Sequence, residues 1–136
     1  MVVEVISVNY LSILGAAVVS FIFGGIWYSF LFERTWEKLS KTRMGVGKPR
    51  WALLLTNFIA SLIIAWVLVH TLVYAGVASI TDALFVTFFT WLGYFALTTS
   101  LGLYLWMGKP FKLYLIEAGF WLINLMLMAI VLTVWS

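Results

Sequence analysis

Residues 51–74 read WALLLTNFIASLIIAWVLVHTLVY, a run of 24 residues without an aspartate, glutamate, lysine or arginine. As a helix, this run is roughly 35 Å long, enough to cross the ~30 Å hydrocarbon core of a bilayer with some tilt. Its apolar side chains lie on nearly every face and do not alternate with polar ones, as they do in a membrane-spanning strand. The segment therefore predicts a transmembrane helix.

Three further apolar runs of similar length occupy about residues 8–32, 83–107 and 113–135. Only 13 of the 136 residues are charged, whereas a soluble domain carries about a quarter of its residues as charge. We therefore predict an all-α polytopic membrane protein, with residues 1–136 forming a single domain of four transmembrane helices in an antiparallel bundle. These spans leave no room for a separate soluble catalytic domain.

The basic residues predict how the chain is oriented in the cell (cytoplasmic) membrane. All eight fall in two loops on one side of the four spans, whereas the other side carries Glu4 and Asp82 and no basic side chain. Because basic loops stay in the cytoplasm, both termini are expected outside. The net charge of +3 then reflects topology and contact with lipid headgroups, not nucleic-acid binding. The eight residues are Arg34, Lys38, Lys41, Arg43, Lys48, Arg50, Lys109 and Lys112.

The first basic loop is expected to contain a short helix. Phe32, Trp36 and Leu39 recur at helical spacing, which predicts an interfacial helix in the headgroup layer that ends at Gly45. Such a helix is either a membrane anchor or a docking surface for a cytoplasmic partner or an anionic lipid. The anchor is favoured, because basic loops of this kind are common for topology alone.

A stripe of small residues runs along the first span. Ser12, Ala16, Ser20 and Gly24 are spaced every four residues, so that another helix can approach closely. The stripe serves either packing within the chain or contact between subunits. Four spans bury only part of their polar groups internally, which favours a homo-oligomer or a subunit of a membrane complex.

Polar residues inside the spans give the clearest candidate site. Glu117 lies in the second turn of the fourth span, and an ionised carboxylate there should be paired, face a wet cavity, or be protonated. Counting depth at 1.5 Å per residue places one polar group from each span in a layer roughly 5–10 Å below the cytoplasmic boundary. Neighbouring polar residues on the third and fourth spans complete the candidate cluster, which comprises Glu117, Asn124, Asn57, Tyr28, Ser29, Thr98 and Ser100.

Near the outer face, His70 and Asp82 could meet across the turn between the second and third spans. The favoured interpretation of Asp82 is stabilisation of a helix N-terminus. A metal site needs three or four ligands, which one chain does not offer here. The sequence also lacks a nucleophile–base set, an HExxH motif and a glycine-rich phosphate loop, so we expect neither a metal, a cofactor nor catalytic residues.

Two segments resemble a known family. The stretch Gly24–Phe32, GGIWYSFLF, is followed by Trp36, and the stretch Gly108–Ile116, GKPFKLYLI, is followed by Gly119. Both are similar to helix ends in the membrane family called "domain of unknown function 1761". Relatives commonly carry a proline after Trp-Tyr-Ser, where this chain has Phe30. The resemblance implies four spans with basic internal loops and brings no established activity.

Two functions remain open. The first is a structural or assembly component that self-associates or joins a larger membrane complex without chemistry of its own. The alternative is a small oligomeric transporter or channel in which Glu117 is the intramembrane coupling acid. In the resembling family a neutral amide is expected at this position, which argues against a coupling role for the family as a whole. A lipid- or quinone-handling enzyme has no support beyond the polar layer.

Overall fold

The computed structural model describes residues 9–40, 49–99 and 106–135, and all regular structure in these ranges is helical. The prediction of an all-helical chain is therefore confirmed. The elements, in chain order, are α1 (Tyr10–Gly25), the π-helix η1 (Ile26–Leu31), α2 (Glu33–Ser40), α3 (Arg50–Tyr74), α4 (Ile80–Trp91), the π-helix η2 (Leu92–Ala96), α5 (Leu97–Thr99) and α6 (Phe111–Val134).

Three helices in the described ranges are long and apolar enough to cross a membrane. They are the continuous α1–η1 helix from Tyr10 to Leu31, then α3, then α6. The remaining apolar run, predicted at 83–107, begins as α4 at Ile80 and continues through η2 and α5 to Thr99, where the described range ends.

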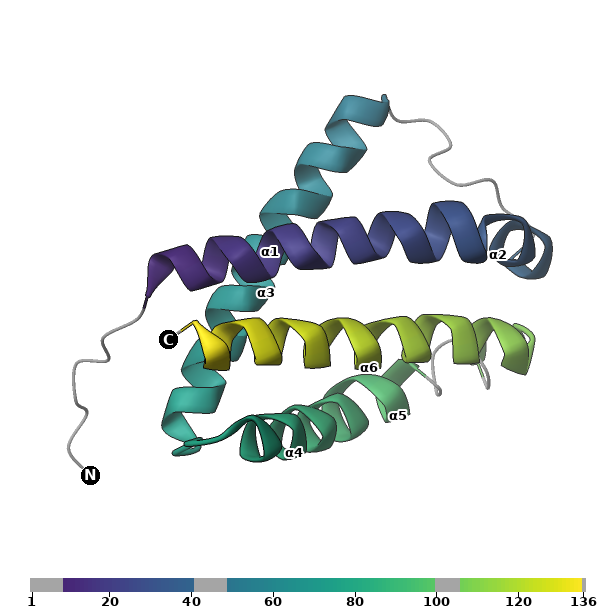
Figure 1. Ribbon diagram of the computed structural model, residues 1–136. Coiled ribbons are helices and arrows are strands. Elements are labelled where there is room, and N and C mark those ends of the chain that lie inside the picture. The colour runs from purple at the N-terminus through teal and green to yellow at the C-terminus, as the bar shows by residue number, and fades with distance from the viewer. Residues whose placement is uncertain (1–8, 41–48, 100–105, 136) are drawn as a thin grey trace.

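The helices are not all parallel to one another. Figure 1 shows α1 and α6 side by side and antiparallel, with α4 along the other side of α6. Helix α3 crosses this layer obliquely: its first turns extend beyond α1, it meets α1 near its middle, and its second half reaches the other helices. Helix α3 therefore packs against the other long helices at one end of the molecule and diverges from them at the other, whereas α1–η1 and α6 stay in contact.

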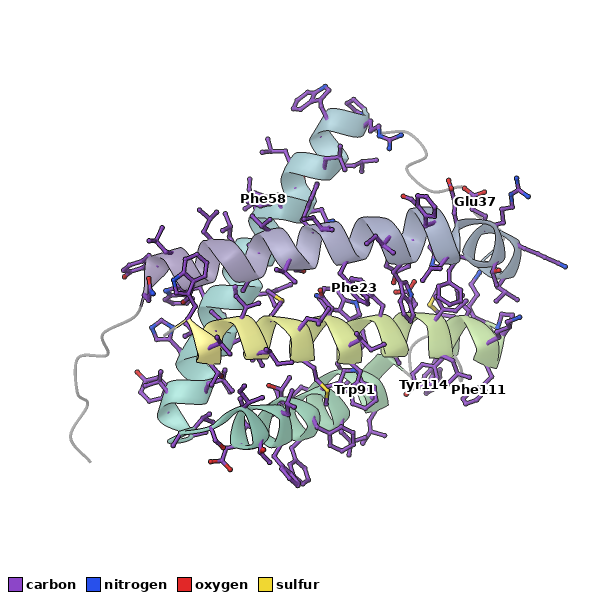
Figure 2. The ribbon with its side chains drawn as sticks, viewed as in Figure 1. Phe23, Glu37, Phe58, Trp91, Phe111 and Tyr114 are labelled. Atoms are coloured by element: carbon purple, nitrogen blue, oxygen red, sulfur yellow. The ribbon has the colours of Figure 1, made fainter. Side chains whose placement is uncertain are left out.

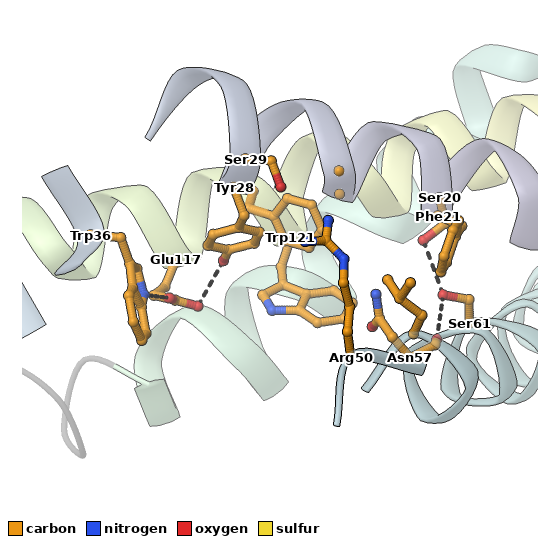
Figure 3. A pocket seen from close by; sticks show the side chains of 14 residues that line it. Ser20, Phe21, Tyr28, Ser29, Trp36, Arg50, Asn57, Ser61, Glu117 and Trp121 are labelled. Carbon is orange, nitrogen blue, oxygen red and sulfur yellow. Dashed lines mark hydrogen bonds between the residues drawn. The ribbon is translucent and has the colours of Figure 1, made fainter. Parts of the chain in front are cut away.

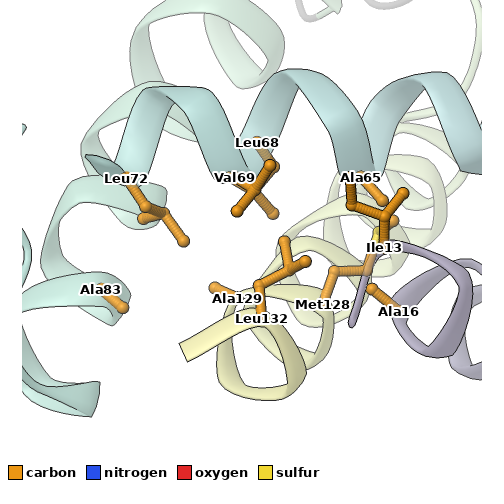
Figure 4. Packing of buried hydrophobic residues seen from close by; sticks show 10 residues of the cluster. All are labelled: Ile13, Ala16, Ala65, Leu68, Val69, Leu72, Ala83, Met128, Ala129 and Leu132. Carbon is orange, nitrogen blue, oxygen red and sulfur yellow. The ribbon is translucent and has the colours of Figure 1, made fainter. Parts of the chain in front are cut away.

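Buried apolar residues fill the end where the helices meet (Figure 4). Four alanines in this cluster, Ala16, Ala65, Ala83 and Ala129, are fully buried and let the helix backbones approach closely. The cluster draws on α1, α3, α4 and α6 and comprises Ile13, Ala16, Ala65, Leu68, Val69, Leu72, Ala83, Met128, Ala129 and Leu132. This core fixes the second half of α3 against α1 and α6.

Hydrogen bonds tie α6 to its neighbours along its length. At its C-terminal end, the Asn9 side-chain amide donates to the carbonyl of Trp135 at 2.8 Å. On the α4 side, Trp91 Nε1 donates to the carbonyl of Ala118 at 2.9 Å, and the Tyr114 hydroxyl donates to the carbonyl of Ala96 at 2.8 Å (Figure 2). These bonds hold α6 as the central helix of the layer.

The small-residue stripe of the first span lies inside the chain. Ser12, Ala16, Ser20 and Gly24 are all buried, and a Cβ atom added to Gly24 would lie 3.6 Å from the Phe120 ring of α6. Ser20 Oγ lies 3.5 Å from Ser61 Oγ of α3. The stripe is thus the face of α1 that packs on α3 and α6.

Candidate functional site

The divergence of α3 leaves a cavity of about 500 Å³ between α1–η1, α3 and α6, with α2 at one end (Figure 3). Helix α3 contributes one face, on which Arg50, Leu54, Asn57 and Ser61 follow one another at intervals of about one turn. The lining residues are Ser20, Phe21, Gly24, Gly25, Tyr28, Ser29, Trp36, Arg50, Leu54, Asn57, Ser61, Glu117, Phe120 and Trp121.

Glu117 joins three elements at one end of this cavity. The Tyr28 hydroxyl of η1 donates to Glu117 Oε2 at 2.9 Å, and the Trp36 indole N–H of α2 donates to Glu117 Oε1. The Tyr28 ring also packs against Phe120 of α6, with ring centroids 4.9 Å apart. Each carboxylate oxygen is therefore held by a neutral donor from a different element, and the carboxylate links η1 and α2 to α6.

Helix α3 carries three further polar residues of the cavity, Arg50, Asn57 and Ser61. Ser61 donates to the carbonyl of Asn57 at 3.0 Å and lies beside Ser20 of α1, so the deep end of the cavity is internally hydrogen-bonded. Arg50 is exposed, and its side chain extends from the first turn of α3 into the cavity toward α1 (Figure 3). The hydrogen bonds of Glu117 come from Tyr28 and Trp36, not from Arg50.

The residues of the predicted polar cluster occupy different places. Tyr28, Ser29, Asn57 and Glu117 line the cavity together. Asn124 does not line it: this residue is completely buried on α6, where its amide nitrogen lies 3.7 Å from the Met128 sulfur. Two members remain, Thr98, whose hydroxyl donates to carbonyls of its own helix, and Ser100, which lies outside the described residues.

His70 and Asp82 make separate contacts. His70 Nδ1 lies 2.7 Å from the carbonyl of Trp66 in its own helix, and the two rings are 4.6 Å apart. Asp82 occupies the first turn of α4, where its backbone N–H donates to the hydroxyl of the N-cap Ser79 at 3.2 Å. Among the residues that the structure describes, no group of three His, Cys, Asp or Glu side chains is placed to hold a metal.

The basic residues also fall into separate groups. Arg34 and Lys38 are exposed on α2, and Lys112 is exposed at the start of α6, where Lys109 is half-buried in the preceding turn. Arg50 alone among these described cations lines the cavity with Glu117. The predicted helix end at Gly45 falls outside the described residues, as do Lys41, Arg43 and Lys48.

Two residues that line the cavity, Trp36 and Arg50, were not predicted to belong to the polar cluster. Helical spacing assigns Trp36 to the apolar face of the interfacial helix, and in the structure that face turns to α6 and places the indole on Glu117. Arg50 has the sequence features of any cation in a basic loop. Its position one turn before Leu54 and two turns before Asn57 is the signal that places it on the polar face of α3.

Residues 11–133, nearly the whole chain, match the family described as "Protein of unknown function (DUF1761)". The chain belongs to this family. Neither a curated protein nor a solved structure matches it. The matched range includes every residue that lines the cavity. The site is therefore part of the family domain itself and not of an added segment.

Proposed function

We propose that this member of the family is a four-span integral membrane protein with a structural role. Its function is to self-associate, and its first partner is a second copy of the same chain. The basic loops lie in the cytoplasm and both termini lie outside. Support comes from three helices long enough to cross a membrane, a fourth apolar helix from Ile80 to Thr99, and basic residues confined to two loops.

One observation carries the assembly proposal: the outer face of the first half of α3 is unsuited to lipid. Thr56 and Asn57 are exposed there, about 10 Å along α3 at 1.5 Å per residue. Ala52, Thr56 and Ala60 are spaced every four residues and line a shallow groove with Leu53 and Asn57. Small residues allow close approach of a second helix, and polar side chains at this depth are stabilised by hydrogen bonds to it.

The proposed interface is not the α1 stripe, which the sequence left open as packing within the chain or contact between subunits. The stripe on α1 is buried within the chain, so it supports packing of the monomer. The outer face of α3 remains accessible. A contact between two copies of one helix face is self-complementary about a two-fold axis, which closes the assembly at a dimer.

The contacts of Glu117 favour a structural role over the transporter alternative. A coupling acid must exchange partners during transport, whereas both oxygens of Glu117 hold neutral donors from η1 and α2. Glu117→Gln separates the two functions. A proton-linked flux in liposomes that disappears in this variant would favour the transporter over the assembly proposal.

Cross-linking tests the assembly proposal directly, because the chain contains no cysteine. Thr56→Cys, in protein reconstituted in lipid vesicles and exposed to a mild oxidant, is expected to form disulfide-linked dimers. Phe85→Cys is the matched control, since Phe85 is 60% exposed on α4, away from the proposed interface. Equal cross-linking of the two variants, or a monomeric wild-type protein in nanodiscs, would show that self-association through α3 is wrong.

Single cysteines also test the orientation. Lys38 lies on α2 and Ala78 lies in the turn between α3 and α4, and both are exposed. In intact cells, a membrane-impermeant maleimide is expected to label Ala78→Cys at once and Lys38→Cys only after lysis. The reverse pattern would contradict the proposed topology.

A further inference from the structure

We infer that the cavity between α1, α3 and α6 binds a phospholipid, with its phosphate group at Arg50 and an acyl chain along the apolar wall. This site and the proposed dimer contact share only Asn57, which lines both the cavity and the outer groove. The cavity is lined by the inner face of α3, which carries Arg50, Leu54 and Ser61, whereas the proposed contact lies on the outer face with Ala52 and Ala60.

The polar end of the cavity has the donors that a phosphate ester requires. Arg50 supplies a guanidinium, whose fork of N–H groups matches phosphate oxygens in pairs. It stands in the first turn of α3, where Pro49 provides no side-chain cap. Ser29, from η1, and Asn57, two turns after Arg50 on the same face of α3, add neutral donors to the same cavity. The guanidinium is thus accompanied by hydroxyl and amide groups on two helices.

The carboxylate in the cavity is already engaged. Glu117 accepts hydrogen bonds from Tyr28 and Trp36 at the α2 end of the cavity. In Figure 3 the Trp121 ring lies between Glu117 and Arg50. These donors and the intervening ring reduce the repulsion that Glu117 would exert on an anion at Arg50.

The rest of the lining favours a lipid over a soluble phosphate ester. Phe21 of α1, Leu54 of α3 and Phe120 of α6 provide apolar surface next to the polar end. Ser20 and Ser61 contact each other at the deep end, so this part of the cavity offers few free polar groups. A volume of about 500 Å³ is in the range of ligand cavities, and Arg50 begins a membrane-length helix, at the level of the headgroups.

Native mass spectrometry of the intact protein in detergent tests this assignment with three probes: phosphatidylglycerol, diacylglycerol with the same acyl chains, and glycerol 3-phosphate. Phosphatidylglycerol is expected to bind best, because only this probe has both the phosphate and the chains. Arg50→Gln should weaken its binding about tenfold, and Arg50→Lys should weaken it less. Lys112→Gln, which removes an exposed charge outside the cavity, should bind as the wild type does.

Three results would overturn the inference: equal binding of diacylglycerol, equal binding of glycerol 3-phosphate, or equal losses in Arg50→Gln and Lys112→Gln. A second measurement needs no variant, and so does not depend on the folding of Arg50→Gln. Phosphatidylglycerol with a photoreactive group on its acyl chain is expected to cross-link to Leu54 or Phe120. Labelling confined to outward-facing residues such as Phe85, which is 60% exposed, would also contradict a site in the cavity.

Discussion

Removing the Tyr28 hydroxyl tests whether Glu117 holds η1 and α2 to α6. Tyr28→Phe deletes one donor to Glu117 Oε2 and leaves the ring that packs against Phe120. A hydrogen bond to a charged group contributes about 1.5–3 kcal/mol in soluble proteins, and bonds between membrane helices contribute about 0.6 kcal/mol on average and about 1.7 at most. Because this contact is only partly buried, we expect Tyr28→Phe to destabilise the protein by about 1–1.5 kcal/mol.

The two donors to Glu117 should act together. Trp36→Phe removes the other donor, and the double variant leaves neither of these two hydrogen bonds on the carboxylate. Groups that share one partner are not additive, so the loss in the double variant is expected to differ from the sum of the single losses by at least about 0.5 kcal/mol. The free energy of unfolding is measured in mixed micelles with increasing dodecyl sulfate, followed by far-ultraviolet circular dichroism.

Tyr94→Phe is the matched control, because Tyr94 is 83% exposed and lines none of the cavity. Its free energy of unfolding should change by less than about 0.5 kcal/mol. If Tyr28→Phe changes stability no more than this control does, and the double variant is additive, Glu117 does not join these helices and the structural interpretation is wrong.

Three further predictions concern other parts of the chain. Met128→Ala should destabilise the protein by about 2–4 kcal/mol in the same unfolding experiment, because Met128 is completely buried, whereas Met107→Ala should have little effect because Met107 is 61% exposed. Thr87→Val should stabilise it by about 1 kcal/mol, since the buried Thr87 hydroxyl has no hydrogen-bond partner among the residues that the structure describes. Thr90→Val, which loses a bond to its own helix, should not stabilise it. Gly76→Ala should destabilise the protein by about 1 kcal/mol through backbone strain alone, because Gly76 has φ +74° and open space around it. An unchanged midpoint of unfolding in dodecyl sulfate would contradict the positive φ at Gly76.

Depth in the membrane follows from the sequence, because it depends only on the position of a residue along a helix. Counting from the helix ends put Tyr28, Ser29, Asn57, Ser100 and Glu117 at one level. Ser100 lies outside the described residues, and the structure places the other four around one cavity. The depth of a residue does not tell which way its side chain turns. Trp36 was assigned to the lipid interface, and it donates to Glu117 instead.

Asn124 shows most clearly what the tertiary structure adds. It lies seven residues after Glu117, nearly two helical turns, so the two share a face of α6. Glu117 nevertheless borders the cavity, whereas Asn124 is fully buried next to Met128 in the core. The difference arises because α3 crosses α6 obliquely: it packs against the part of α6 that holds Met128 and Leu132, and it diverges toward the end of α6 that borders the cavity.

The sequence by itself determined the helical class, the family and the apolar lengths that suit a membrane, because these depend on local composition and spacing. It also confined the basic residues to two loops. Only the tertiary structure decided that the α1 stripe is internal and that Arg50 and Glu117 share a cavity. Both depend on the crossing of α3, which is set by how side chains from distant parts of the chain fit together.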